Sequence, residues 1–328
     1  MLIDTYKLLF LLSCGIIYRR QKGWFIMFVI DDTYTILPDK LRGRKPKFKL
    51  KKDGKTYIYK YGSINNEIWA ELIAEQLGKQ AGIEMAHYEV AEYKGTIGVI
   101  TDYFLNSTEL IMSSDNLKAN VQAIYDENNI KFNIRENTIT NIVSAATTYD
   151  DRVDGEELTR ELMLRWCFHG LIMESDKNET NIAFIKGFNP LRLTPDYDNS
   201  SMAALDRNIQ NIMSSLMQGQ NFYGFTDSFK SNLRINKNDT GDFFVDFANF
   251  CNKYPKQAEY CINQLNNINI EEAFTRVEEI NSVQIPWDIQ FWVSKTLTSR
   301  LEDMNTIYNQ NKKDTRNKTF VKKVDTIS

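Results

Sequence analysis

The sequence predicts an α+β protein of two lobes: a small β-rich N-terminal lobe with one main helix, then a larger, mainly helical C-terminal lobe. Up to residue 105, short β-rich runs lie between turn residues, which is typical of strands. From residue 106 onward, apolar residues recur with the period of about 3.6 residues that amphipathic helices have. The chain has 328 residues, more than one compact core usually holds, so its length also favours two lobes.

The first lobe is expected to contain a small sheet and one helix. The pair Asp53-Gly54 lies between two β-rich runs and predicts a hairpin, because these residues favour the tight turns that join antiparallel strands. A helix is expected at 65–77, since apolar residues recur there at helical spacing and Gly78 or Gly82 can end it. The expected strands are 25–30, 47–50, 56–61 and 96–103.

The second lobe is expected to be built from amphipathic helices and to end in a basic tail. The tail carries six Lys or Arg residues against two Asp, with little apolar periodicity, so a frayed or disordered end is expected. The helices are expected at 117–128, 155–174, 243–254, 271–280 and 289–308. The predicted divisions are an extension or strand at 1–30, an N-lobe at 31–105, a C-lobe at 106–304 and the tail at 305–328.

The composition excludes several classes of site. The formal net charge of -3 gives no overall signal for nucleic acid, and no nucleic-acid partner is expected. Four cysteines without a C-x-x-C pair argue against a zinc site or a disulfide framework. Only two histidines are present, so a histidine-rich metal site is excluded. Chemistry in this chain must therefore depend on carboxylates, lysines and amides.

The N-terminus contains an apolar run at 8–17 that has the length of a signal-peptide core. It is too short to span a bilayer, so stable membrane insertion is not expected. Residues 11–14 loosely resemble a lipoprotein cleavage site ending at Cys14, and a buried strand or a frayed extension is the alternative. The cytoplasm is the default location.

The most informative motif is the segment 175–181, SDKNETN, which directly follows an apolar helix. Its spacing is D-x-x-x-x-N, from Asp176 to Asn181. A carboxylate here can accept the proton of a substrate hydroxyl, and an amide oxygen can bind Mg²⁺. A second carboxylate, Asp198, follows two β-like runs. Alone the motif is weak, because Asp and Asn are common in surface loops.

A lysine at the end of an expected strand strengthens the hypothesis. Lys60 ends the run YIYK, where an ammonium could reach the phosphates of a nucleotide. Alternatively, Lys60 is one of ten Lys and Arg residues between Lys40 and Lys60 that form a solvated face. Glu67 and Glu71, one helical turn apart, are candidates to hold Lys60, and Glu67 is favoured.

A basic turn precedes this lysine strand. The segment 41–47, LRGRKPK, occupies the place of a phosphate-covering loop, although it is not a G-x-G-x-x-G loop. Gly43 permits close approach of the backbone and the basic side chains supply charge. A plain basic turn is the alternative. The order of lysine strand, D-x4-N loop and later Asp favours a bilobal protein-kinase-like fold that transfers phosphate from ATP with Mg²⁺.

Five segments carry a family resemblance: RGRKPKFKL, YIYKYGS with NEIWAELIAEQLGKQAGI, GVITDYF, HGLIMESDKNETNIAFI and LRLTPDYDNSS. In this order the chain resembles the HipA-like serine/threonine kinase family, over about residues 40–105 and 156–201. The resemblance implies a protein kinase that uses ATP and Mg²⁺, phosphorylates a protein substrate and autophosphorylates. It also raises secretion or translocation into a host cell as an alternative location.

The resemblance implies a role for each motif residue. Asp176 is implied as the catalytic base, Asn181 and Asp198 as Mg²⁺ ligands, and Lys60 as a phosphate contact. The 42–47 turn would cover the nucleotide, and the backbone of 102–104 would meet adenine. The residues expected to bind the nucleotide or its metal are Arg42, Gly43, Arg44, Lys45, Pro46, Lys47, Lys60, Glu67, Asp102, Tyr103, Phe104, Asn178, Asn181 and Asp198.

Two departures from the family pattern limit what the resemblance implies. The family commonly has His where this chain has Asn178, and its covering loop often carries a serine that 42–47 lacks, so regulation at that serine is not expected. Too few residues precede residue 40 for the extra domain of the toxin members, so no antitoxin partner is expected. A lipid or small-molecule kinase with the same site, and a nucleotide-binding pseudokinase or interaction module, remain open.

Overall fold

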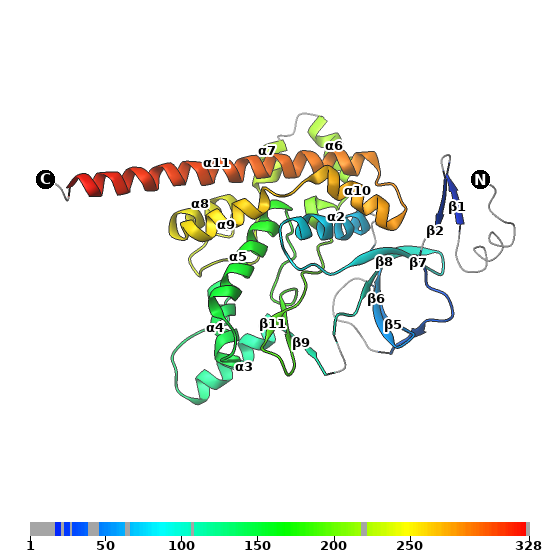
Figure 1. The fold of residues 1–328 in the computed structure, drawn as a ribbon, viewed down its shortest axis with the longest axis horizontal. Helices are drawn as coiled ribbons and strands as arrows, with labels where there is room; N and C mark the ends of the chain where they lie inside the picture. Colours follow the sequence, from blue (N-terminus) through cyan, green and yellow to red (C-terminus); the bar gives the residue numbers. More distant parts are fainter. Residues whose placement is uncertain are drawn as a thin grey trace.

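The computed structural model describes residues 17–20, 23–26, 28–38, 46–62, 66–105, 108–217 and 222–325. It confirms the α+β prediction: strands dominate the N-terminal part, and helices dominate the C-terminal part (Figure 1). Among the described residues, no helix is both long enough and apolar enough to cross a membrane.

The N-terminal sheet has six strands in the order β3-β7-β8-β6-β5-β4. The pairings are antiparallel except that of β3 with β7. Asp53 and Gly54 have φ values of 51° and 79°, as a two-residue hairpin turn requires, so the predicted hairpin is confirmed. A separate antiparallel pair joins β1 (Ile17–Arg20) to β2 (Gly23–Ile26). The strands of the larger sheet are β3 (Phe28–Val29), β4 (Thr35–Ile36), β5 (Lys47–Lys52), β6 (Lys55–Lys60), β7 (Tyr88–Tyr93) and β8 (Thr96–Asp102).

The register of β5 and β6 separates an apolar face from a basic face. Phe48 lies opposite Tyr59, and both belong to a small aromatic core beneath the sheet. Lys47 lies opposite Lys60 on the other face, because cross-strand partners share a face and successive residues alternate. The alternation of Lys with aromatic residues in these strands therefore places Lys60 on the face opposite the aromatic core.

The predicted helix of this lobe is α2 (Asn66–Gln80), and it is buried along most of its length. It lies beside α10 (Ile270–Asn281), from the far end of the chain (Figure 1). Asn281 at the end of α10 accepts a hydrogen bond from the backbone N–H of Val90 at 2.7 Å, which joins α10 to the sheet. This contact surface explains why α2 lacks a simple one-sided apolar stripe.

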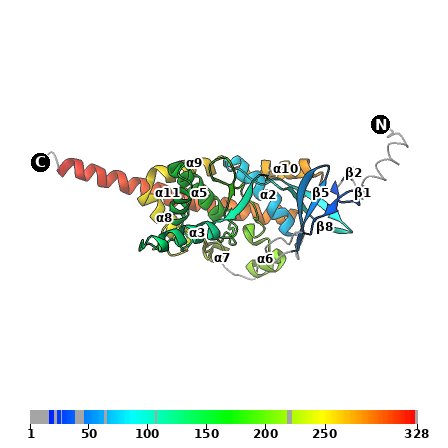
Figure 2. The same ribbon diagram turned by 90° about the horizontal axis from the view of Figure 1, so that it is seen from below.

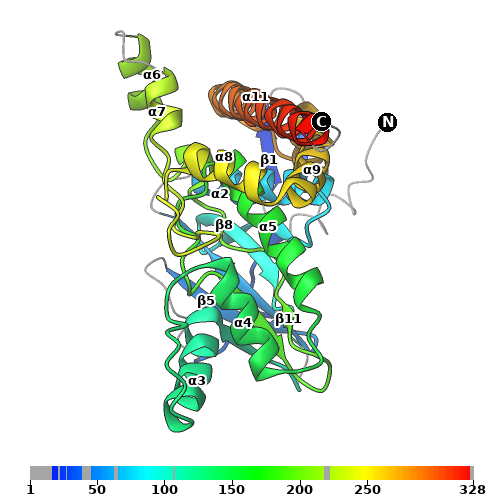
Figure 3. The same ribbon diagram turned by 90° about the vertical axis from the view of Figure 1, so that its left-hand side faces the viewer.

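The C-terminal part packs around α5 (Gly155–Leu171), which is buried from Leu162 to its end. Figure 3 looks along α11 (Trp287–Asp325), with α8 (Phe243–Lys253) and α9 (Pro255–Leu265) beneath it. The guanidinium of Arg300 on α11 is buried and donates to the carbonyl of Gly170 at 2.7 and 2.9 Å. The other elements of this part are β9 (Leu110–Ser113), α3 (Ser114–Glu127), α4 (Ile139–Tyr149), β10 (Ala183–Lys186), β11 (Arg192–Leu193), α6 (Ile209–Met217) and α7 (Phe222–Asp227).

The end of the chain differs from the sequence expectation. A frayed tail was expected from residue 305, but α11 continues as one helix to Asp325 and projects beyond the body of the protein (Figures 1 and 2). Met304 is fully buried, and Lys312 pairs with Glu259 of α9 at 2.7 Å. The contact of Lys312 with α9 lies within the segment that was expected to be frayed.

Candidate active site

Lys60, at the end of β6, lies between two carboxylates. Its Nζ is 2.5 Å from Oε1 of Glu71 and also contacts Oδ1 of Asp198, which is 138 residues away in sequence. Although burial opposes the charged form, Glu71 and Asp198 hold the pKa of the Lys60 ammonium well above its ordinary value. The structure thus brings together the lysine and the later aspartate that the sequence singled out.

The partner of Lys60 on α2 is Glu71, which corrects the preference for Glu67. The second oxygen of Glu71, Oε2, accepts a hydrogen bond from the backbone N–H of Asn199 at 2.8 Å. Glu71 therefore faces both Lys60 and the segment after Asp198, while Glu67 lies one turn earlier on the helix. The two glutamates cannot be ranked from sequence, because the rotation of α2 about its axis depends on its packing.

Asp198 is held as an ionised carboxylate at the open side of this cluster. Its backbone adopts φ 60°, which is uncommon for a residue with a side chain, and its N–H donates to the hydroxyl of Tyr88 at 3.3 Å. Burial opposes ionisation, but Lys60, together with Lys47 and Lys177, holds the pKa of Asp198 well below its ordinary value. The carboxylate is ready to bind a cation at neutral pH.

The D-x4-N loop lies between α5 and β10 and is closed by its own hydrogen bonds. The carbonyl of Asp176 accepts from the backbone N–H of Asn178 at 2.9 Å and from Nδ2 of Asn181 at 2.6 Å. Nδ2 of Asn178 donates to Oδ1 of Asp176 at 3.0 Å. Asp176 is exposed to solvent. The amide oxygen Oδ1 of Asn181 is the atom that could bind a cation, because the amide nitrogen is only a donor.

A buried aspartate joins this loop to the segment that carries Asp198. Lys177 donates to Oδ1 of Asp196 at 3.0 Å and also to the carbonyl of Tyr197. His169 lies 2.9 Å from the other oxygen of Asp196. Despite burial, His169 and Lys177 hold the pKa of Asp196 well below its ordinary value. The two halves of the site are therefore cross-linked by charged groups inside the protein.

The predicted hinge connects the sheet to the same segment. Tyr103 donates its N–H to the carbonyl of Thr56 at 2.9 Å, and Nζ of Lys49 lies 4.4 Å from the centre of the Tyr103 ring. The Phe104 ring lies 6.1 Å from the Tyr197 ring, centre to centre. Asp102 ends β8 and is exposed. Residues 102–104 therefore lie near the segment that carries Asp198. Their role in binding adenine remains a prediction.

The covering turn is described only at its end. Pro46 accepts a hydrogen bond from the N–H of Tyr61 at 3.3 Å, and Lys47 lies opposite Lys60. Four of its predicted nucleotide contacts lie outside the described residues: Arg42, Gly43, Arg44 and Lys45.

Asp198 and Asn181 offer oxygen donors of the types that a magnesium ion prefers. Mg²⁺ typically takes one or two carboxylates, phosphate oxygens and water, and it does not need a protein cage. Asp198 is ionised, and Asn181 presents a carbonyl oxygen. Among the described residues there is no cluster of three or more His, Cys, Asp or Glu side chains suited to a metal, which excludes a cage but not this arrangement.

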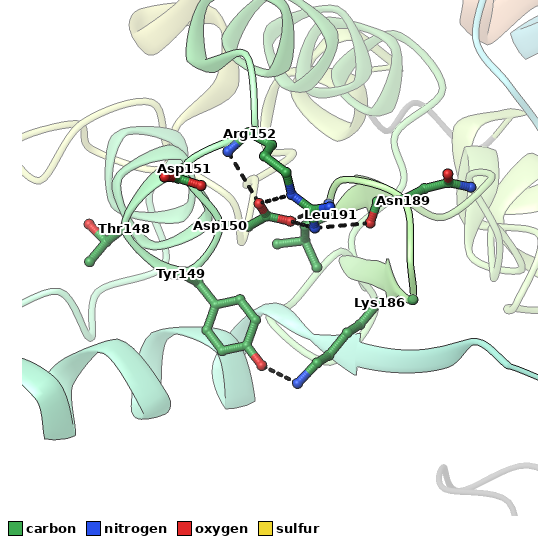
Figure 4. Close-up of a pocket in the computed structure, with 9 residues that line it drawn as sticks. Thr148, Tyr149, Asp150, Asp151, Arg152, Lys186, Asn189 and Leu191 are labelled. Carbon is green, nitrogen blue, oxygen red and sulfur yellow. Dashed lines mark hydrogen bonds and ion pairs between the residues drawn. The ribbon is translucent and has the colours of Figure 1, made fainter.

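A surface pocket elsewhere in the described structure does not involve the predicted site residues. It has a volume of about 500 Å³ and lies between the end of α4 and the β10–β11 turn (Figure 4). Within it Arg152 binds Asp150 at 2.8 Å, and Lys186 donates to the hydroxyl of Tyr149. We therefore assign the functional site to the Lys60 cluster.

The family profile of the HipA-like C-terminal domain matches residues 40–273. The chain belongs to this family. The match begins at the covering turn and includes Lys60, the D-x4-N loop and Asp198, so the resemblance expected from the five segments is confirmed. The chain is accordingly a kinase-like member of the HipA-like family. No curated protein matches the chain.

Two solved structures share the fold. The proinflammatory kinase CtkA of Helicobacter pylori has a TM-score of 0.66 and 14% identity, covering 87% of this chain and 98% of its own. HipA of Shewanella oneidensis MR-1, in complex with HipB and operator DNA, has a TM-score of 0.54 and 14% identity. The match covers 94% of this chain and 73% of the HipA chain. The first of these confirms the expected kinase-like fold. The second was solved with its antitoxin system, so the expectation that this family member has no antitoxin partner gains no support.

Several residues of this HipA-like site were missed by sequence reasoning. Asn199 and Asp196 flank Asp198 in the segment PDYDN, so their proximity to it was available as a signal. Tyr88 had no such signal, because it reaches Asp198 only through the folding of β7 against the C-terminal part. Glu174 and Ser201 likewise meet only in the tertiary structure.

Proposed function

We propose that this HipA-like protein is a serine/threonine protein kinase that transfers the γ-phosphate of ATP to a protein hydroxyl, with Mg²⁺, and that it autophosphorylates. The observation that carries the proposal is the buried contact of Lys60 with both Glu71 and Asp198. Phosphoryl transfer requires a fixed cation at the phosphates and an ionised carboxylate for the metal. Lys60 can serve as the cation and Asp198 as the carboxylate.

The chain's own groups account for the steps of the transfer. Asp176, exposed at the start of its loop, accepts the proton of the attacking hydroxyl. The hydroxyl oxygen bonds to the γ-phosphorus, the bond to the bridging oxygen breaks, and ADP leaves. Lys60 opposes the charge of the phosphates, and Asp198 and Asn181 hold the metal. Mg²⁺, when bound, would supply charge neutralisation at the phosphates.

Replacement of the proposed base tests this function. Asp176→Asn is expected to lower the rate of phosphate transfer by about 10²- to 10⁴-fold, because general-base catalysis contributes rate factors of that order. The melting temperature should stay close to that of the wild type, since Asp176 is exposed. Asp151→Asn is the matched control, because Asp151 is also an exposed aspartate in a turn.

The assay measures transfer from labelled ATP to protein acceptors, to lipid acceptors and to the chain itself. Transfer to protein that is lost in Asp176→Asn supports the proposal. Transfer only to lipid would instead support a lipid kinase with the same site. Binding of Mg-ATP without turnover would indicate a pseudokinase, and undiminished transfer in Asp176→Asn would remove Asp176 as the base.

A further inference from the structure

Glu174 is a buried carboxylate that the proposed mechanism does not use. It lies two residues before Asp176 and is only 2% exposed. Its Oε1 accepts the backbone N–H of Asp176 at 2.8 Å and also the hydroxyl of Ser201. Its Oε2 accepts the backbone N–H of Ser201 at 3.1 Å. The Glu174 carboxylate therefore connects the D-x4-N loop to the segment that follows Asp198.

Ser201 reinforces the same connection from its side. Its hydroxyl oxygen lies 3.1 Å from the backbone N–H of Ser175, which donates to it. The path from Asp176 to Asp198 through Glu174 and Ser201 is short, because Ser201 is three residues after Asp198. A shift of the Glu174 carboxylate would move the proposed base relative to the proposed metal ligand.

The segment around Asp198 is held at three points by buried charged side chains. Lys177 holds Asp196 and the carbonyl of Tyr197, before Asp198. Glu71 holds the N–H of Asn199, directly after it. The third point is Glu174, and unlike Lys177 it bonds directly to the backbone of Asp176. It therefore adds a direct contact between the backbone of Asp176 and the segment that carries Asp198.

The energetics favour a specific role over simple stability. Burial is the largest effect on this carboxyl and raises its pKa to about 7, so keeping the charge in the interior is costly. A buried charge that costs stability is often retained where its geometry is needed. The three donors that surround the carboxylate provide that geometry.

We infer that Glu174 is a positioning residue that sets the location of Asp176 relative to Asp198 by binding Ser201. This inference rests on the proposed function. Glu174 does not contact the reacting atoms in this account. Its effect on the reaction is exerted through the backbone N–H of Asp176.

The test compares Glu174→Gln, Ser201→Ala and the double variant with the wild type. Glutamine is similar in shape, but its amide group must face one of the backbone N–H donors, so one contact is lost. We expect kcat for labelled phosphate transfer to fall by about 10- to 100-fold in Glu174→Gln, since small misplacements of reacting groups cost this much. KM for ATP should stay within about twofold, because the contact of Lys60 with Glu71 is not altered.

The double variant supplies a readout that a general loss of stability does not move. Because the Ser201 hydroxyl donates to the Glu174 carboxylate, the effects of the two variants are coupled, and the double variant should lose little more than Glu174→Gln alone. Additive losses in kcat would overturn the pairing. If Glu174→Gln does not fold, Ser201→Ala still tests the inference, since unchanged kcat in that variant would overturn it.

The matched control is Asp246→Asn on α8. Asp246 is also buried and accepts two backbone N–H groups and one hydroxyl, from Thr240 and Gly241. We expect it to change the melting temperature while kcat stays near the wild-type value. Wild-type kcat in folded Glu174→Gln would overturn the inference alone. Absence of transfer by the wild type would overturn the proposed function and this inference with it.

Discussion

The pairing of Lys60 with Glu71 can be tested by removing one charge from α2. Glu71→Gln keeps the size of the side chain but removes the negative charge 2.5 Å from the Lys60 ammonium. Glu67→Gln is the matched control, because Glu67 lies one turn away on the same buried helix. The sequence favoured Glu67 as the partner and the structure identifies Glu71, so the two variants should separate.

The size of the effect follows from the burial of the pair. Removal of one partner of a buried ion pair typically costs about 3–5 kcal/mol. Lys60 keeps Asp198 as a partner, and the glutamine can still accept one hydrogen bond, so we expect a loss of about 1–3 kcal/mol in the free energy of unfolding. Released from Glu71, Lys60 should be misplaced relative to the phosphates, with a loss of about 10²-fold in kcat/KM.

Two measurements on the purified variants decide the matter. Denaturant unfolding gives the change in stability, and initial rates of labelled phosphate transfer over a range of Mg-ATP concentrations give kcat/KM. Glu67→Gln should lose less kcat/KM than Glu71→Gln. A larger loss in Glu67→Gln, or wild-type kinetics in Glu71→Gln, would refute the assignment of Glu71.

Two further predictions concern stability. The Glu174 carboxyl has an ordinary pKa of 4.5 and a pKa of about 7 in the folded protein. Between these pH values the folded protein keeps a proton that the unfolded chain releases. The free energy of unfolding should therefore fall by roughly 3 kcal/mol as the pH rises through this range. Denaturant unfolding from pH 4.5 to 7.5 should show this slope in the wild type and a flatter slope in Glu174→Gln. Of the charged groups that face the carboxyl, Lys177 lowers its pKa and Asp198 raises it. Gly98→Ala would place a Cβ 2.4 Å from the carbonyl of Lys60, so we expect a loss of about 2 kcal/mol or more and reduced transfer. Gly187→Ala is the control, because its Cβ would come no closer than 3.1 Å, to Cγ of Glu109, and would meet no backbone atom closer than 3.7 Å; equal melting temperatures for the two variants would contradict the prediction.

Local patterns were sufficient for much of the fold. The Asp53-Gly54 turn, the position of α2 and the change from strands to helices near residue 105 depend on neighbouring residues, and they were predicted. The expected frayed end from residue 305 was not matched, since α11 continues to Asp325, and the contact of Lys312 with Glu259 joins residues too far apart in sequence for local periodicity to record.

The same division applies to the candidate site. Lys60, the D-x4-N loop and Asp198 stand out in the sequence, because phosphate chemistry needs few residue types in a set order. The identity of their supports came only with the tertiary structure: Glu71 on the correct side of α2, Tyr88 beneath Asp198, and Glu174 facing Ser201. Which side of a mostly buried helix meets a lysine, and which distant backbone a carboxylate binds, depend on how elements pack against one another. That information is not contained in the spacing of residues along one segment.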